Sequence, residues 1–413
     1  MKHRSVLISL VLSAALLCAC GAPSGSNSGS SHSASSDNPA SSDSQDPLTL
    51  SPMETRWYPE FQDQLIPRDD YGSLFPFRGA YAGNNDHSAP YGYGLMTQDG
   101  VVVLDSVLDD AYHCSYQDAD GEFYSLPVLT LTKEAVLWEE WGSTPAYALA
   151  SLDGSWVTGF DFFDVIPFPG GVAVSDPEKL SILDPESGAV LRSWTWEELG
   201  IVIPLDSSFS PGGGERESSP QWALGAIYLG RDVQGEARML DPETGVVTTL
   251  PLQQVSDYIT HIDQDLRRGL VSCQVSEDES IILTFREQEY RLPGLLSQDV
   301  SAWVTEDDQV ILSQRDGLYA VVSLNGDVIF PVQPERIEEF SSSGGESLLA
   351  VQQGNAWQLY DSNGSPLASV PGSSDSWGGM AGPFVEISEE NSTSYYDPVT
   401  GTCVLRTHWE LQA

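Results

Sequence analysis

The sequence predicts an all-β fold built from repeated hairpins. From about Pro52 to the end, short runs rich in Val, Ile, Leu, Tyr and Trp alternate with clusters of Gly, Pro, Asn and Asp. This is the pattern of strands separated by turns. Long stretches with a helical period are missing, and only Thr195–Leu199 and Leu252–Ile259 are expected to form short helices. The third observation is an internal repeat.

The repeat is a strand ending near an aromatic residue, an Asp or Asn turn that closes on Gly, and a second apolar strand. Its copies are Tyr93–Leu104, Tyr147–Val157, Leu180–Trp194, Ala237–Leu250, Tyr319–Phe330, Trp357–Ala368 and Ser394–Arg406. The turn glycines are Gly100, Gly154, Gly188, Gly245, Gly326, Gly364 and Gly401. The widest gap, between Gly245 and Gly326, contains a degenerate copy without glycine, Ile281–Leu292.

The residue types at the turn have a structural explanation. A tight hairpin needs a backbone φ above zero, which Gly adopts without a Cβ clash. An Asp at the start of the turn accepts a hydrogen bond from a backbone N–H two residues later. The seven glycines therefore predict seven similar corners and do not mark catalytic sites.

Composition excludes several classes of protein. The 413 residues include 18 Lys and Arg against 60 Asp and Glu, which gives a net charge of −42. Such a chain repels polyanions, so we expect no nucleic-acid partner. Hydrophobic residues make up 40% of the chain and aromatic residues 10%, more than is typical of a disordered protein.

The N-terminal residues 1–20 are typical of a targeting segment. Lys2, His3 and Arg4 form a basic region, and the uncharged apolar run Ser5–Leu17 is too short to span a bilayer. The following Leu17-Cys18-Ala19-Cys20 resembles the lipobox of bacterial lipoproteins. The resemblance implies lipidation of Cys20, cleavage before it, and a membrane anchor. The alternative is an ordinary cleaved signal peptide.

Residues 21–50 are predicted to be a disordered, Ser-rich tether. The 26 residues from Gly21 to Asp46 include 11 Ser and no large apolar side chain. Such a segment buries too little surface to offset the entropy of ordering it. As a flexible coil it would hold the folded part roughly 28 Å from the lipid.

Residues 51–413 form the predicted repeat domain. Segments such as DPESGAVLRSW and DPETGVV are similar to the blade hairpins of PQQ-type and WD-type β-propellers, and GLYAVVSLNGDVIFPVQ resembles bacterial WG-repeat proteins. The resemblance implies a single β-propeller of about seven blades, within a range of six to eight. An open β-solenoid of hairpins is the alternative. Ring closure would let Thr55–Phe61 or Leu74–Tyr81 complete the blade that ends at Val404–Leu411, and would let Cys114 approach Cys403.

The sequence singles out no catalytic, cofactor-binding or metal-binding residue. The histidines are scattered and show no zinc spacing. Asp118–Glu122 resembles part of a calcium loop, although an ordinary turn explains it better. Ser151–Trp156 faintly resembles the Asp-box of sialidases, and the favoured interpretation is another hairpin turn. We therefore expect no cofactor.

These features predict a non-catalytic binding or scaffold lipoprotein of the cell envelope. It would lie on the outer side of the cytoplasmic membrane, or on the outer membrane of a cell that has one, and present its repeats to a protein or polysaccharide. Two alternatives remain open: an envelope glycan hydrolase that uses carboxylates at the ring centre, and an envelope assembly factor. An enzymatic role is undecided, with a non-enzymatic one favoured.

Overall fold

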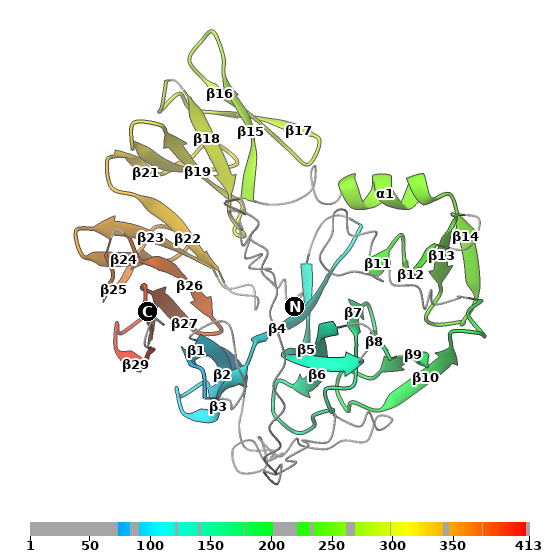
Figure 1. Ribbon diagram of the computed structural model, residues 1–413. Coiled ribbons are helices and arrows are strands. Elements are labelled where there is room, and N and C mark those ends of the chain that lie inside the picture. The colour runs from blue at the N-terminus through cyan, green and yellow to red at the C-terminus, as the bar shows by residue number, and fades with distance from the viewer. Residues whose placement is uncertain are drawn as a thin grey trace, which may run out of the picture.

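The computed structural model describes residues 73–82, 91–119, 123–138, 142–176, 178–200, 221–231, 235–261, 269–297, 299–341, 347–373 and 375–409. In these ranges the chain is all-β, as expected, with one helix, α1 (Leu252–His261) (Figure 1). The expected helix at Leu252 is therefore confirmed. The expected signal segment, the tether, Thr55–Phe61 and part of Asp118–Glu122 lie outside the described residues.

The helix expected at Thr195–Leu199 is wrong. Thr195 ends a strand, and the next residues form a turn. The Thr195 backbone N–H donates to the Glu198 carboxylate (2.8 Å), while the Glu198 N–H donates to the Thr195 hydroxyl (3.2 Å). This reciprocal cap closes one turn, and Gly200, at φ 65°, ends it before a helix can extend.

The described strands form seven antiparallel sheets. The first is β1 (Leu74–Ala80), β2 (Tyr91–Thr97) and β3 (Val102–Leu108), and the second is β4 (Asp110–Gln117), β5 (Phe123–Trp138) and β6 (Gly142–Ser151). The third is β7 (Asp164–Phe168), β8 (Gly171–Ser175), β9 (Lys179–Leu183) and β10 (Val190–Thr195), and the fourth is β11 (Gln221–Ala223), β12 (Ala226–Arg231), β13 (Ala237–Leu240) and β14 (Val247–Leu250).

The remaining three sheets follow in the C-terminal half. The fifth comprises β15 (Gly269–Val275), β16 (Ile281–Phe285), β17 (Gln288–Leu292), β18 (Val300–Val304), β19 (Gln309–Gln314), β20 (Tyr319–Ser323) and β21 (Val328–Gln333). The sixth is β22 (Ile337–Ser341), β23 (Ser347–Gln353), β24 (Ala356–Tyr360) and β25 (Pro366–Pro371), and the seventh is β26 (Trp377–Ala381), β27 (Phe384–Ser388), β28 (Ser392–Tyr396) and β29 (Cys403–His408).

We call seven strands, one from each sheet, the inner strands. Six of them, β1, β4, β7, β11, β22 and β26, lie toward the middle of the molecule (Figure 1). The seventh, β18, begins the run β18–β19–β20–β21 of the fifth sheet and has β15 on its other side. Last strands such as β10, β14, β25 and β29 lie at the periphery (Figure 1). Several inner strands contact their neighbours directly: β22 contacts β26, β26 contacts β1, β4 contacts β7, and β7 contacts β11. Neighbouring sheets therefore meet through these inner strands, and the seventh sheet meets the first.

All seven predicted corners are confirmed. Each turn glycine has a positive φ, between 67° at Gly188 and 89° at Gly326. In the DPESG turn, Asp184 Oδ1 accepts the backbone N–H groups of Glu186 and Ser187 at 2.9 Å. The same Asp geometry recurs in the corners that begin at Asp241 and Asp397. The repeat found in the sequence is therefore a structural repeat.

The corners also pack against neighbouring sheets in one recurring manner. A Cβ added to Gly188 in the third sheet would lie 2.7 Å from Trp156, which follows the second sheet. Gly245 stands in the same relation to Trp194 of β10, at 2.9 Å. The pattern continues with Gly364 against Ile329, Gly401 against Ala368, and Gly100 against Val404. In this last contact, the corner of the first sheet lies against the last strand of the seventh.

Hydrophobic clusters join neighbouring sheets in the same order. Such a cluster lies between the first and second sheets, the second and third, the third and fourth, the fifth and sixth, the sixth and seventh, and the seventh and first. The last of them includes Phe77 and Met96 from the first sheet with Phe384 and Tyr395 from the seventh. Burial of apolar surface therefore joins the two ends of the described chain.

The first strand plays a different role from the one expected for Leu74–Tyr81. Strand β1 does not complete the last sheet: it pairs with β2 from Leu74↔Thr97 to Ala80↔Tyr91. The seventh sheet already has four strands of its own. The two sheets meet through side chains and not by sharing a strand.

The fourth and fifth sheets depart from the repeating arrangement. Among the described residues, no hydrophobic cluster joins them. Val255, Tyr258 and Ile259 of α1 pack on the fourth sheet. The fifth sheet folds back on itself, so that β16 and β17 share a cluster with β18, β19 and β20. Two local additions thus cover the faces that would otherwise meet.

The degenerate copy Ile281–Leu292 is the β16–β17 hairpin of this fifth sheet. It contains no glycine, yet the residues at its turn, Arg286 and Glu287, have φ values of 51° and 60°. Positive φ at both central positions is the requirement of a type I′ turn. The corner geometry is therefore kept at a cost in backbone strain.

Candidate functional site

The inner strands carry most of the described carboxyl groups whose pKa is raised by burial. These groups are Asp110, Asp164, Asp176, Glu338, Glu339 and Glu386. Asp110, Asp164, Glu338 and Glu339 belong to β4, β7 and β22. By contrast, backbone hydrogen bonds lower the pKa of the corner residues Asp184 and Asp397.

The inner strands also present large aromatic side chains to solvent. Tyr112 on β4 is 43% exposed, Trp303 on β18 is 45% exposed, and Trp377 on β26 is 49% exposed. Desolvation nevertheless raises the pKa of Tyr112. Protein around the Tyr112 hydroxyl therefore displaces part of its water although the side chain remains partly exposed. Aromatic and acidic groups thus both occur on the inner strands.

Trp303 is held in place from the neighbouring sheet. Its Nε1–H donates to Glu339 Oε2 (3.0 Å), and the backbone N–H of Glu306 donates to Glu339 Oε1 (2.8 Å). Burial raises the pKa of Glu339, these two bonds lower it, and the charge of Asp307 raises it again. Leu270, opposite Trp303 in the β15–β18 register, is 72% exposed.

A second polar group lies where the first and seventh sheets meet. The Arg78 backbone N–H donates to Tyr395 Oη (2.6 Å), and its Nη2 donates to Tyr93 Oη (3.4 Å). The guanidinium lies 4.9 Å from the centre of the Tyr91 ring, within cation–π range. Glu386, opposite Tyr395 in the strand register, has its pKa raised by burial and lowered by the charge of Arg78. We call Arg78, Tyr91, Tyr93, Glu386 and Tyr395 the junction cluster.

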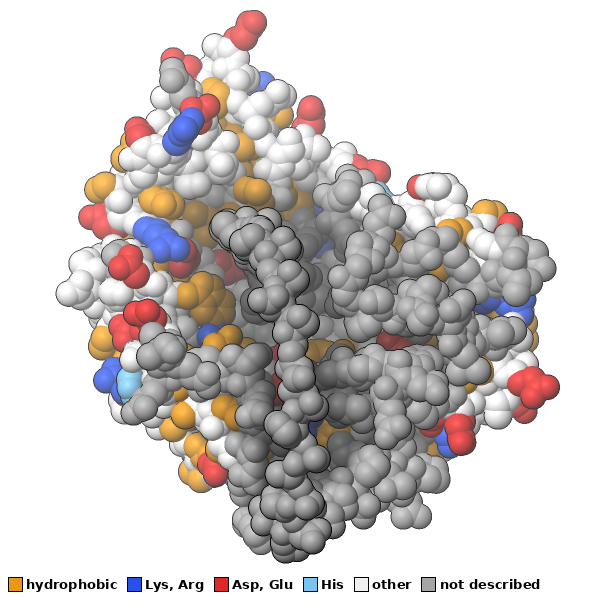
Figure 2. Space-filling view, in the orientation of Figure 1, with side chains coloured by type: hydrophobic (Ala, Val, Ile, Leu, Met, Phe, Trp, Pro, Cys, Tyr) orange, Lys and Arg blue, Asp and Glu red, His pale blue; other side chains and the backbone are white. Residues whose placement is uncertain are grey.

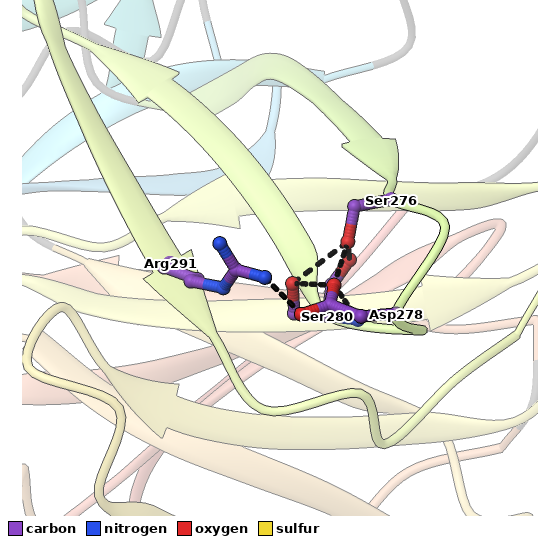
Figure 3. Close-up of polar contacts among 4 residues, drawn as sticks. All are labelled: Ser276, Asp278, Ser280 and Arg291. Carbon is purple, nitrogen blue, oxygen red and sulfur yellow. Dashed lines mark hydrogen bonds and ion pairs between the residues drawn. The ribbon is translucent and has the colours of Figure 1, made fainter.

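A third polar group, on the exposed β16 side of the fifth sheet, is explained by its turn. Asp278 accepts hydrogen bonds from the hydroxyls of Ser276 and Ser280 and forms an ion pair with Arg291 (Figure 3). These bonds lower the pKa of Asp278. The four side chains bond one another and are explained by the turn between β15 and β16, so nothing in this group points to a ligand.

No metal centre emerges in the described ranges, where no group of three or more His, Cys, Asp and Glu could hold an ion. Burial lowers the pKa of His113 to about 4, so its imidazole is neutral at pH 7. The Asp153 turn resembling an Asp-box is one of the corners, with Gly154 at φ 71°. The interpretation as a hairpin turn is therefore confirmed.

The three cysteines in the described residues do not pair. Cys114 is buried, Cys403 is exposed and Cys273 is half-buried, and all three are free. Cys114 contributes to the cluster between the second and third sheets, whereas Cys403 begins β29 of the seventh sheet. Cys273 packs against the core of the fifth sheet and donates to the Val300 carbonyl (3.0 Å).

The space-filling view matches the composition. Acidic side chains are spread over the described surface, basic ones are few, and hydrophobic side chains lie between them (Figure 2). Sequence reasoning missed both Arg78 and Trp303. Arg78 had a signal, because a basic residue inside an apolar strand is unusual in a chain with only 18 Lys and Arg. Trp303 had none, since a Trp in an alternating strand is more often a core residue.

Helices give no indication of a membrane crossing: within the described residues, none has the length and apolarity that a span requires. This finding concerns the described chain alone.

No protein-family model matches the chain, and no curated protein matches it. Among solved structures, a eukaryotic initiation factor aligns with a TM-score of 0.35 at 10% identity, over 82% of this chain and 96% of that one. AztD from Citrobacter koseri aligns with a TM-score of 0.27 at 11% identity, over 82% and 96%. The complex of KlAtg21 with the coiled coil of AgAtg16 gives 0.27 at 12%, over 73% and 100%. Scores and identities this low establish no shared function.

Proposed function

We propose that the chain is a non-catalytic binding lipoprotein of the cell envelope, with its seven sheets arranged as the blades of a β-propeller. The observation that carries the propeller is the recurring corner contact, which extends from Gly188 against Trp156 around to Gly100 against Val404. An open solenoid would leave its first and last repeats apart. Here a hydrophobic cluster joins them, which favours the ring.

Binding is proposed for the inner strands. Tyr112, Trp303 and Trp377 are exposed on them. Tyr and Trp are enriched among the residues that contribute most to binding at protein interfaces. The partner is a protein or polysaccharide. The test is binding of the full-length protein, in detergent, to envelope extract and to a glycan array. A variant with Tyr112, Trp303 and Trp377 all changed to Ala should lose the retained ligand, and undiminished binding would contradict the proposal.

Anchoring is proposed through Cys20, with the protein on the outer side of the cytoplasmic membrane or on the outer membrane of a cell that has one. The support is the lipobox-like sequence alone. Cells expressing the chain and fed labelled palmitate should incorporate label, and Cys20→Ala should abolish both the label and membrane fractionation. A Cys18→Ala variant is the matched control and should keep both.

Hydrolysis of envelope glycans is the second candidate, because burial raises the pKa of Asp110 and Glu386, and both carboxyls act electrostatically on the junction cluster. A carboxyl with a raised pKa is suited to act as a general acid. If the chain releases reducing ends from envelope glycan, Glu386→Gln should remove that activity, and the non-catalytic proposal would fall.

A further inference from the structure

Trp303 and Leu270 form a small apolar surface on one face of the fifth sheet. They are directly opposite in the β15–β18 register, and 45% and 72% of their respective surfaces are exposed. Side chains opposite each other on antiparallel strands lie within contact distance. Together with Glu339, which contacts Trp303 from β22, we call them the Trp303 surface.

The indole ring of Trp303 is oriented before any partner arrives. Its only polar atom is bonded to Glu339, and Glu339 is bonded in turn to the backbone of Glu306. A side chain fixed in this way loses little conformational entropy on binding. The ring therefore offers a rigid, exposed π-face next to a carboxylate.

The nearest charge that acts on Glu339 has the same negative sign. The main influences on the Glu339 carboxyl are burial, hydrogen bonds from Glu306, Trp303 and Ser347, and the repulsive charge of Asp307. Within the described residues, no cation is among these main influences. The whole chain carries −42, which adds a long-range field of the same sign.

We infer that the Trp303 surface binds a basic segment of a partner protein, with a Lys or Arg side chain lying over the indole and in the field of Glu339. Trp is the best aromatic partner for a cation, and the negative surroundings complement a positive partner. A neutral glycan would use the ring but gain nothing from the charge. This inference rests on the proposed binding function and specifies the class of its partner.

The test uses calorimetric titration of the full-length protein in detergent with a twelve-residue Lys-Gly repeat peptide. Trp303→Ala should weaken binding by about 3- to 30-fold, the range expected for loss of a cation–π contact. Trp303→Phe keeps an aromatic ring and should lose less peptide affinity than Trp303→Ala does. Leu191→Ala removes an exposed apolar side chain (52% exposed) from the peripheral strand β10 and should leave the affinity unchanged. Glu339→Gln should weaken binding and flatten its dependence on salt.

The outcomes separate this inference from the proposed function. Equal affinities for wild type, Trp303→Ala and Leu191→Ala would show diffuse charge attraction and overturn the inference. Binding of chitohexaose that depends on Trp303, without binding of the peptide, would overturn it in favour of a glycan and leave the proposed function standing. If peptide, glycan and envelope extract all fail to bind, both proposals fall. Thermal melts of each variant identify any loss of folding. If Trp303→Ala fails to fold, the affinity of Trp303→Phe for the peptide decides whether the inference stands.

Discussion

The hydroxyl of Thr407 donates a hydrogen bond to the backbone carbonyl of Arg78, 2.6 Å away and 329 residues earlier in the chain. Thr407 lies on the last strand of the seventh sheet and Arg78 on the first strand of the first. The bond therefore crosses the junction between the two ends of the described chain. Its neighbours are the buried Tyr395 and the hydrophobic cluster around Phe77 and Phe384.

Thr407→Val should lower the free energy of unfolding by about 1 kcal/mol, because the Arg78 carbonyl loses a partner at a half-buried position. Urea unfolding measures the change. Thr248→Val, on exposed β14 of the fourth sheet, is the matched control and should alter stability by less than about 0.5 kcal/mol. If the two variants are equal, the junction bond does not contribute to stability.

Removal of residues 403–413 tests the whole junction. This truncation deletes β29 and its contacts with β1, so all sheets should melt together at a lower temperature if they form one cooperative ring. Melting followed by both circular dichroism and Trp fluorescence would reveal this. An unchanged melting temperature, or loss of the seventh sheet alone, would contradict closure.

Much of this architecture follows from the sequence because the corners are specified locally. Gly100 and Gly401 predict turns because a turn needs positive φ at these positions. The Asp residues of DPESG and DPVTG predict turns because their side chains accept backbone hydrogen bonds. The same reasoning located the degenerate copy and the helix at Leu252, but not the sheets that they cover. Helix α1 packs on the fourth sheet and the β16–β17 hairpin folds over the fifth. Both placements depend on tertiary packing that no local pattern encodes.

The candidate site was less predictable for a similar reason. Strand alternation shows that Trp303 and Leu270 lie on one face, but not whether a neighbouring sheet covers that face. The junction cluster brings together residues about 300 positions apart, such as Tyr93 and Tyr395. Their proximity depends on ring closure, which composition and spacing suggest without fixing which side chains meet.

Gly188→Ala should destabilise the protein more than Gly354→Ala. Both glycines have positive φ, at 67° and 63°, so each substitution adds backbone strain of about 1 kcal/mol. An added Cβ at Gly188 would also lie 2.7 Å from the Trp156 ring, whereas nothing lies within 4 Å at Gly354. Urea unfolding should show the difference, and equal losses would mean that the corner does not pack against the preceding sheet.

The pH dependence of stability should reveal the buried Glu386. Burial raises its pKa above 4.5, the ordinary value of a glutamate, despite the charge of Arg78, so the folded protein holds this proton more tightly than the unfolded chain does. Above pH 4.5 and up to the raised folded-state pKa, the stability contributed by this group falls as pH rises. The difference in unfolding free energy between wild type and Glu386→Gln should therefore change across this window. Glu389→Gln, at an exposed position after the same strand, should show no such change.

Glu287→Gly should stabilise the β16–β17 hairpin. Glu287 has a φ of 60°, a conformation that costs a non-glycine residue about 1–2 kcal/mol. Glycine removes that strain but makes the unfolded chain more flexible by about 0.4–1 kcal/mol, so the net gain should be about 0.5–1 kcal/mol. Glu289→Gly, within β17, is the control and should destabilise, because glycine weakens a strand interior. Urea unfolding of both variants measures the change. A loss of stability in Glu287→Gly would mean that contacts of the Glu287 side chain stabilise the fold by more than its backbone strain destabilises it.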